Sequence, residues 1–393
     1  MYLSKEEEKM LEGEYGFATQ KSMEILVTLA KIYNAEKLIE VSSVQVAGVS
    51  YQTIGDAGLE FLEEMAKDGK VRVRSTLNPA GIDLQDWKKF KFPEDFVEKQ
   101  MRIIEAYKKM GIEITCTCTP YLVGNLPREG EHIAWSESSA VTYANSVLGA
   151  RTNREGGPSA LAAALTGRTP FYGLHLDEER IPTVSVKVNV SLKNASDFGI
   201  LGYIIGKNFK NEVVFIKGIK TANLEELKSL SASIVTYGSK PLFYIENITP
   251  GWRKLEIPKE KIEIDREDVE KAKVEISDSF KDFDFICIGC PHASIEEIKQ
   301  IATLLKGKKI KNVELWIATS RFVKRISDDL GYTRIIEEAG GKVICDTCMV
   351  VAPLKGRFKG LLTNSAKACY YSKNQMKTKL ASLEECIKFA VKE

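Results

Sequence analysis

Short apolar, β-branched segments alternate with amphipathic segments of helical period along almost the whole chain, and this alternation restricts the fold most. It is clearest near the C-terminus, where the strand patterns FDFICIG, VELWIAT and GGKVICD are separated by helical patterns. Strands joined through helices pair in parallel. We therefore expect an α/β protein with parallel or mixed sheets flanked by helices, and ligand sites at the carboxyl ends of strands.

The same patterns assign elements to the rest of the chain. Amphipathic helices are expected at 5–12, 17–33, 54–67 and 94–110. Strands are expected at Lys37–Val46, Val71–Leu77 and Ile112–Cys118, and helices rich in small residues at Ser138–Leu148 and Pro158–Leu165. Residues 183–249 predict strand, helix, strand, helix, strand.

A chain of 393 residues is long enough for two or three domains. The polar, charge-dense stretch Gly251–Lys273 is the best candidate for a connection between domains. We expect an N-terminal α/β region at 1–115, a central α/β region at 116–270, and a C-terminal α/β region with two cysteine loops at 271–393.

Charge and hydrophobicity limit the partners that the chain can have. The net charge is +2, from 56 basic and 54 acidic residues, which argues against a nucleic-acid surface. No apolar run approaches the roughly 20 residues that cross a bilayer. The N-terminus is acidic and helical in pattern, unlike a signal peptide. We expect a cytoplasmic protein that binds neither membrane nor nucleic acid.

The cysteines are grouped rather than scattered. Six of the eight form three close pairs, each at the end of an expected strand: Cys116 with Cys118, Cys287 with Cys290, and Cys345 with Cys348. A chain of this size and compartment does not use cysteines as a disulfide framework. Within each pair, the earlier cysteine suits a buried strand position and the later one suits the strand end.

We therefore expect Cys118, Cys290 and Cys348 to converge on a metal group. Ser294 can cap a helix beside Cys290, and a helix N-terminus favours the thiolate that binds metal. Three readings remain open from the residues: core cysteines, a zinc site built from the C-x₂-C pairs, or an iron–sulfur cluster with one iron open to substrate. Cys369 and Cys386 lie on helical patterns and are interpreted as packing residues.

The chain resembles the aconitase X family over essentially its whole length. The resemblance lies in VSSVQVAGVSY, TLNPAG, CTCTPYLVGN, AWSESSAVTYANSVLGARTNREGGPSAL, CPHAS and CDTCMVVAP. It implies an aconitase-like, multi-domain catalytic body and a 4Fe–4S cluster with three cysteine ligands and one open iron, which can appear as a 3Fe–4S cluster when oxidised. Aconitase takes two ligands from one C-x₂-C, whereas one from each pair is expected here.

The resemblance also implies an activity and a partner. It implies the large subunit of a hydro-lyase that dehydrates (R)-5-phosphomevalonate to trans-anhydromevalonate 5-phosphate in the archaeal mevalonate pathway. The alternative is a cis-3-hydroxy-L-proline dehydratase, as in bacterial members. The sequence shows no aconitase-like swivelling domain, so we expect a small swivelling subunit in a heterodimer, and we expect its serine to supply the base. No general base is assigned in this chain.

The resemblance implies substrate contacts at several residues that, from their amino-acid type alone, could have other roles. The loop after a strand can be a plain turn or an anion site, the helix start can be only a cap, and a lysine can be a surface residue. The expected substrate-binding residues are Gly48, Val49, Ser50, Asn78, Pro79, Glu137, Ser138 and Lys367.

Several further residues are open between site and structural roles. Arg151 and Arg154 suit either an anion site or loop stabilisation. His292, beside Cys290, can orient the cysteine loop or be an ordinary buried histidine. Two further alternatives are a metal-stabilised protein without activity and an RNA-binding relative of aconitase. RNA binding is disfavoured because the chain has no aromatic-basic stripe.

Overall fold

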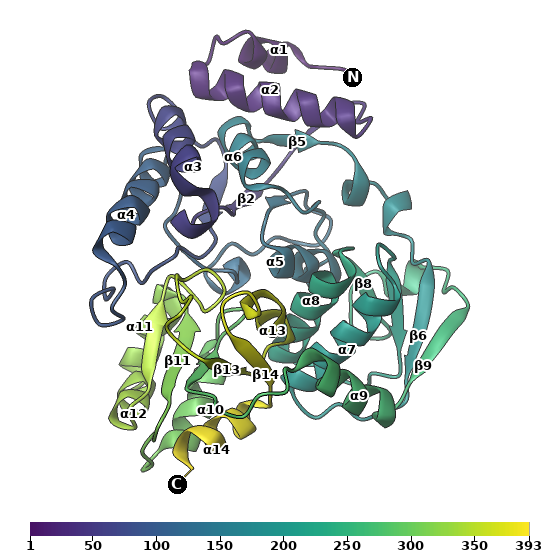
Figure 1. Cartoon of the computed structure of the whole chain (residues 1–393). Coiled ribbons are helices and arrows are strands. Elements are labelled where there is room, and N and C mark those ends of the chain that lie inside the picture. The colour runs from purple at the N-terminus through teal and green to yellow at the C-terminus, as the bar shows by residue number, and fades with distance from the viewer. Residues whose placement is uncertain (393) are drawn as a thin grey trace. The chain divides into compact units, whose positions relative to one another are not determined.

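The computed structural model describes residues 1–392, which divide into two compact units. Unit 1 is Met1–Ile181 and unit 2 begins at Pro182; Figure 1 colours the chain from purple to yellow along both. Of the boundaries expected from sequence, 115/116 lies inside unit 1 and 270/271 inside unit 2. Unit 1 contains one parallel sheet and unit 2 contains two, each with helices packed on it, so the expected α/β class is confirmed.

The N-terminal part of unit 1 is a helical hairpin on a small ladder. Helices α1 (Lys5–Leu11) and α2 (Phe17–Ile32) pack together and enclose their own apolar cluster. Strand β1 (Leu38–Glu40) pairs antiparallel with β5 (Arg168–Pro170). The single strand expected at Lys37–Val46 is therefore wrong in part, because residues 38–40 and 43–46 belong to different sheets.

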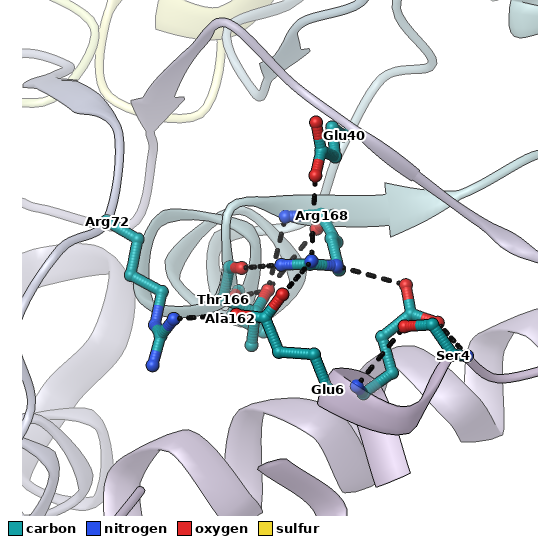
Figure 2. A network of polar contacts seen from close by, with 8 residues as sticks. Ser4, Glu6, Glu40, Arg72, Ala162, Thr166 and Arg168 are labelled. Carbon is teal, nitrogen blue, oxygen red and sulfur yellow. Dashed lines mark hydrogen bonds and ion pairs between the residues drawn. The ribbon is translucent and has the colours of Figure 1, made fainter. Parts of the chain in front are cut away.

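Arg168 joins the hairpin to this ladder (Figure 2). Its Nε donates to Glu7 at 3.0 Å, and its terminal nitrogens contact Glu6 at 2.9 Å and Glu40 at 3.6 Å. The Glu7 and Arg168 side chains are 10% and 11% exposed, so this ion pair is shielded from water. Arg72 reaches the other oxygen of Glu6 at 3.3 Å.

The main sheet of unit 1 has three parallel strands in the order β3-β2-β4. These are β2 (Ser43–Val46), β3 (Arg74–Leu77) and β4 (Ala134–Trp135). Helices α3 (Tyr51–Met65), α4 (Glu94–Lys109) and α6 (Gly157–Thr166) supply the apolar side chains of its core. The helices expected at 54–67, 94–110 and 158–165 are confirmed, with α3 beginning three residues earlier.

The strand expected at Ile112–Cys118 is wrong. The segment makes one isolated parallel bridge, between Glu113 and Thr76. Beyond it, the Thr115 hydroxyl replaces a backbone group, because Leu77 N donates to Thr115 Oγ1 at 3.0 Å. Cys116 has a φ of 40°, outside the β region, so Cys116 and Cys118 do not end a strand as predicted.

The helix expected at Ser138–Leu148 changes its winding halfway. Helix α5 covers Ser138–Tyr143, and the wider π-helical turn η2 covers Ala144–Leu148. Gly149, with a φ of 73°, ends the segment in the left-handed conformation that glycine adopts without strain. The remaining short turns of unit 1 are η1 (Pro120–Leu122), η3 (Gly173–His175) and η4 (Glu178–Arg180).

The first sheet of unit 2 is parallel, in the order β8-β7-β6-β9. Its elements are β6 (Val184–Val188), α7 (Ala195–Asn208), β7 (Val214–Lys217), α8 (Leu224–Gly238), β8 (Phe243–Ile245), η5 (Trp252–Lys254), β9 (Glu260–Ile264) and α9 (Arg266–Ile276). The strand–helix order predicted for 183–249 is confirmed. The connection predicted at Gly251–Lys273 is wrong, because β9 pairs with β6 inside the sheet.

Helices α7 and α8 pack unusually closely, which explains the glycines of the DFGILGYIIG segment. A Cβ on Gly202 would lie 2.7 Å from Ser233 Cβ, and one on Gly206 would lie 2.7 Å from the Ile234 carbonyl oxygen. Only a residue without a side chain permits this approach.

The second sheet of unit 2 has five parallel strands in the order β12-β11-β10-β13-β14. Its strands are β10 (Phe285–Ile288), β11 (Glu314–Thr319), β12 (Lys342–Cys345), β13 (Gly360–Thr363) and β14 (Lys377–Leu380). Its helices are α10 (Ile295–Leu305), α11 (Arg321–Asp329), α12 (Tyr332–Glu338), α13 (Ala366–Ser372) and α14 (Leu383–Val391). Because all five strands run the same way, the loops after them share one edge. No helix among the described residues is long and apolar enough to cross a membrane.

Candidate active site

The carboxyl edge of the three-stranded sheet in unit 1 gathers most of the residues predicted to bind substrate. Strand β2 is central, and its backbone holds the start of both neighbouring loops. Asn78 N, just after β3, donates to Val46 O at 2.9 Å, and Ser136 N, just after β4, donates to Gln45 O at 3.0 Å. The loops after all three strands therefore begin at the same level, and Gly48, Asn78 and Glu137 each follow a different strand.

The loop Gly48–Ser50 follows β2 directly. Gly48 has a φ of 78°, and Val49 and Ser50 are almost fully buried. Helix α3 then begins at Tyr51 but is interrupted at Gly55, whose φ of 59° and ψ of −163° are not helical. The dipole of the longer part of α3 is therefore not continuous with this loop, so anion binding here would depend on the local N–H groups.

Gln100, a residue that sequence reasoning missed, holds this loop in place. Its Nε2 donates to Val49 O at 2.8 Å, while its Oε1 accepts from Tyr51 N at 3.0 Å and Gly81 N at 2.9 Å. Gln100 thus ties the loop after β2 to the loop after β3. A polar residue on the apolar face of helix α4, three residues from both Val97 and Ile103, is the signal that identifies such a residue from sequence.

Asn78 and Glu137 contact each other across the edge. Asn78 Nδ2 donates to Glu137 Oε2 at 2.9 Å. The other carboxylate oxygen accepts from the Ser139 hydroxyl at 3.1 Å and from Ser139 N at 3.4 Å, which makes Glu137 the N-cap of α5. The cap role that the sequence leaves open at this helix start belongs to Glu137, while Ser138 is the first residue of the helix.

Gln45, in the middle of β2, is a second residue that sequence reasoning missed. It is completely buried, and its side chain contacts three segments of the edge. Its Nε2 lies 3.1 Å from Thr117 O and 3.5 Å from Asn78 Oδ1, and its Oε1 accepts from Glu137 N at 3.1 Å. Thr117 N in turn donates to Leu77 O at 2.9 Å, so the segment that contains Cys118 belongs to this edge.

The two arginines left open by the sequence lie in different environments. Arg151 donates to His175 O at 3.0 Å and forms an ion pair with Asp177, which fits the loop-stabilising role. Arg154 is exposed. The Nδ1 atoms of His132 and His175 are 2.9 Å apart, so one donates and the other accepts. Burial, His132 and the nearby arginines lower the pKa of His175 to about 3, which keeps it neutral.

Two of the cysteine pairs share the carboxyl edge of the five-stranded sheet in unit 2. Cys290 follows β10 by two residues and Cys348 follows β12 by three, on either side of β11. The buried His292 joins the two loops, because its Nε2 lies 3.1 Å from Thr347 O. A carbonyl oxygen can only accept, so His292 carries a proton on Nε2.

Buried charges fix the same two loops from outside. The Lys228 ammonium donates to His292 O at 3.0 Å and forms an ion pair with Glu297 inside the protein. Arg321 Nε donates to the buried Asp346 at 3.1 Å, between Cys345 and Cys348. A metal group held by side chains just beyond strand ends needs loops whose positions are fixed in this way.

Within each pair, the two cysteines differ in burial. Cys116, Cys287 and Cys345 are 0% exposed, whereas Cys118, Cys290 and Cys348 are 6%, 8% and 5% exposed. Burial raises the pKa of Cys287 well above its ordinary value, and burial raises the pKa of Cys369 to about 12. A thiol whose pKa is raised in this way stays protonated and is a poor metal ligand. Cys386 is also fully buried, as the packing interpretation predicts.

Lys367 lies at the first turn of α13, just after β13, the strand next to β10. The side chain is buried, and its Nζ lies 5.9 Å from the centre of the Tyr371 ring. The surface position that is usual for a lysine is therefore excluded. A lysine buried just beyond a strand end lies where ligand sites of parallel sheets occur, so its positive charge suits an anionic ligand.

The residues fit an iron–sulfur cluster in donor chemistry, although residues 1–392 contain no group of three or more His, Cys, Asp or Glu placed to hold a metal ion. Thiols are the ligands that such clusters use, and two of them follow β10 and β12, the strands on either side of β11 in unit 2. Thr347 Oγ1, next to Cys348, is buried without a hydrogen-bond partner, which is unusual and favours a further group at this edge.

Comparison with known proteins covers the whole chain. The chain matches the family models for the aconitase X first domain over residues 1–178, second domain over 182–273 and third domain over 283–392. It is 51% identical to the phosphomevalonate dehydratase large subunit of Methanocaldococcus jannaschii, over 99% of this chain and 100% of that one. It is 32% identical to the cis-3-hydroxy-L-proline dehydratase of Pseudomonas aeruginosa, over 98% of this chain and 69% of that one.

A solved structure gives the same result. The crystal structure of Thermococcus kodakaraensis aconitase X in its holo-form matches with a TM-score of 0.93 and 50% identity, over 99% of this chain and 100% of that chain. This chain therefore belongs to the aconitase X family.

Proposed function

We propose that this chain is the large subunit of a dehydratase that converts (R)-5-phosphomevalonate to trans-anhydromevalonate 5-phosphate. The observation that supports this most directly is the 51% identity, over essentially full length, to an archaeal protein named phosphomevalonate dehydratase large subunit. The similarity to cis-3-hydroxy-L-proline dehydratase is lower and leaves almost a third of that protein unmatched.

The reaction removes the elements of water and changes no oxidation state overall. A proton leaves the carbon next to the carboxylate, the hydroxyl leaves the following carbon, and a double bond forms between them. A 4Fe–4S cluster with one open iron would supply Lewis-acid assistance to the departing hydroxyl. We propose Cys118, Cys290 and Cys348 as its ligands.

The substrate roles follow from the chemistry of the side chains. The N–H groups of Gly48, Val49 and Ser50 suit an anionic group of the substrate. The Glu137 carboxylate can accept a hydrogen bond from a substrate hydroxyl, and Asn78 holds that carboxylate in one orientation. The remaining members of the proposed contact set are Pro79 and Ser138 at the same edge, and Lys367, whose ammonium supplies positive charge for a carboxylate or phosphate.

We propose a small subunit as the partner, in a heterodimer, because the relative from Methanocaldococcus jannaschii is named a large subunit. A serine of that partner would complete the proton transfer, since no general base is assigned in this chain. The chain itself would bind and orient the substrate and hold the cluster.

The test is an anaerobic dehydration assay of this chain co-purified with the product of the neighbouring gene. We expect loss of water from (R)-5-phosphomevalonate and no turnover of cis-3-hydroxy-L-proline. Turnover of the proline substrate alone would reverse the assignment. A colourless, zinc-containing preparation would contradict the cluster, because an iron–sulfur protein is brown with broad visible absorption.

A further inference from the structure

The amide of Gln45 has an orientation that its surroundings determine completely. Glu137 N can only donate, so the Gln45 atom that faces it is the oxygen. Thr117 O can only accept, so the atom that faces it is the nitrogen. The same nitrogen then faces Asn78 Oδ1, which leaves Asn78 Nδ2 to donate to Glu137 Oε2. Gln45, Asn78 and Glu137 thus form a closed ring of hydrogen bonds.

We propose that Gln45 is a positioning residue for the dehydration. Its side chain holds Asn78 and Glu137 in the orientation that binds substrate, and holds the peptide unit between Thr117 and Cys118. This inference rests on the proposed function for its chemistry, but its geometry belongs to unit 1 alone. Gln45 acts through other groups and is assigned no contact with the substrate.

The ring explains why an amide is present where an apolar residue would pack. Gln45 lies between Val44 and Val46 in a strand whose residues are all buried. Burying an amide there costs free energy unless every polar atom is bonded, and an apolar side chain of equal size would avoid this cost. Without Gln45, the Asn78 amide could rotate and place its oxygen against the Glu137 carboxylate, where two acceptors repel each other.

Two substitutions of Gln45 separate positioning from space filling. Gln45→Met keeps the volume and removes all three contacts. Gln45→Glu keeps the shape and the acceptor for Glu137 N, but as a carboxylate it cannot donate to Thr117 O or Asn78 Oδ1. The matched control is Asn125→Leu, which removes a buried amide that bonds Val44 O and Thr76 Oγ1 of the same two strands, away from the loops.

In the two-subunit enzyme we expect both Gln45 variants to lose roughly 10²-fold in kcat/KM, as for a misplaced catalytic group. Asn125→Leu is expected to stay within about threefold. Combining Gln45→Met with Asn78→Ala should cost about as much as the larger single change, because both break one ring. A Gln45→Glu variant with wild-type kinetics, or a double variant whose losses multiply, would overturn the proposal.

Amide hydrogen exchange of the full chain supplies a readout that needs neither substrate nor cluster. We expect faster exchange in peptides that contain Thr117 and Glu137 for both Gln45 variants, with the Asn125→Leu variant unchanged there. Even without a variant, the Glu137 amide must be strongly protected in the unmodified chain. Unchanged or unprotected exchange would refute the positioning role. An enzyme inactive on phosphomevalonate would instead refute the proposed function and leave the exchange result standing.

Discussion

The two sheet edges that hold the candidate residues are built from different chemistry. In unit 1, the edge is a network of amides, backbone groups and the Glu137 carboxylate, centred on Gln45 and Gln100. In unit 2, the edge carries thiols, buried ion pairs and the buried Lys367. Buried hydroxyls without a partner also occur there, at Thr347 and Thr363.

This difference indicates a division of work. Amide hydrogen bonds are directional and here almost fully paired, so the edge of unit 1 is already ordered for binding a neutral or anionic organic group. Thiols just beyond strand ends, and a buried Thr347 hydroxyl without a hydrogen-bond partner, favour an additional group, so the edge of unit 2 suits a cluster, and the positive charge of Lys367 suits an anion. The predictions below test this comparison.

The largest effect is expected from the later cysteine of each pair. Cys118→Ser, Cys290→Ser and Cys348→Ser should each abolish the visible absorption of the anaerobic protein and its dehydratase activity. The matched controls are Cys116→Ser, Cys287→Ser and Cys345→Ser. These should keep the colour and lose about 1–3 kcal/mol of unfolding free energy, because a hydroxyl replaces a buried thiol. The opposite pattern would show that the earlier cysteines are the ligands.

Lys367 should affect activity and stability in opposite directions. Lys367→Met removes a positive charge from a proposed anion site, and we expect about a 10²-fold loss of kcat/KM. The free energy of unfolding should stay the same or rise, because an apolar side chain is easier to bury than an ammonium. Thermal unfolding and steady-state kinetics measure the two. A variant that is less stable but fully active would assign Lys367 a structural role.

A smaller effect is expected at the contact between the cysteine loops. His292→Leu removes the bond to Thr347 O, and we expect chelator-induced loss of the visible absorption to become about 10–100-fold faster. The control is His132→Leu, a half-buried histidine of unit 1 whose Nδ1 contacts His175. If the His292 variant and the unmodified protein lost their visible absorption at the same rate, the contact between the loops would not contribute to retention of the cluster.

The smallest effect on activity is expected at Arg168, in the β1–β5 ladder of unit 1. Arg168→Met leaves the buried Glu7 without its charged partner, so we expect a loss of about 3–5 kcal/mol in unfolding free energy and unchanged kcat/KM at low temperature. Arg72→Met, which breaks a more exposed pair with Glu6, should cost at most about 1 kcal/mol. Denaturant titration measures both, and a catalytic defect in Arg168→Met would contradict this separation.

Local pattern was sufficient for most elements of the fold. The strand–helix order between β6 and β8 agrees with the structure because each element has its own period of burial. The failures occurred where a nonlocal partner decides the conformation. The Cys116 segment is not a strand because the Thr115 hydroxyl occupies a backbone position, and residues 260–264 form β9 because β6 is available for pairing.

The sequence alone determined that two cysteine pairs, Cys287 with Cys290 and Cys345 with Cys348, fall at strand ends and that glycine, asparagine and glutamate residues follow strands, because periodicity and turn chemistry are local properties. The tertiary structure decided which of these meet. Gln45 and Gln100 are read from sequence as isolated polar residues among apolar neighbours. They hold the loops of the site together only because parallel pairing brings the ends of β2, β3 and β4 to one edge. There, a single amide side chain can hydrogen-bond to more than one of these loops.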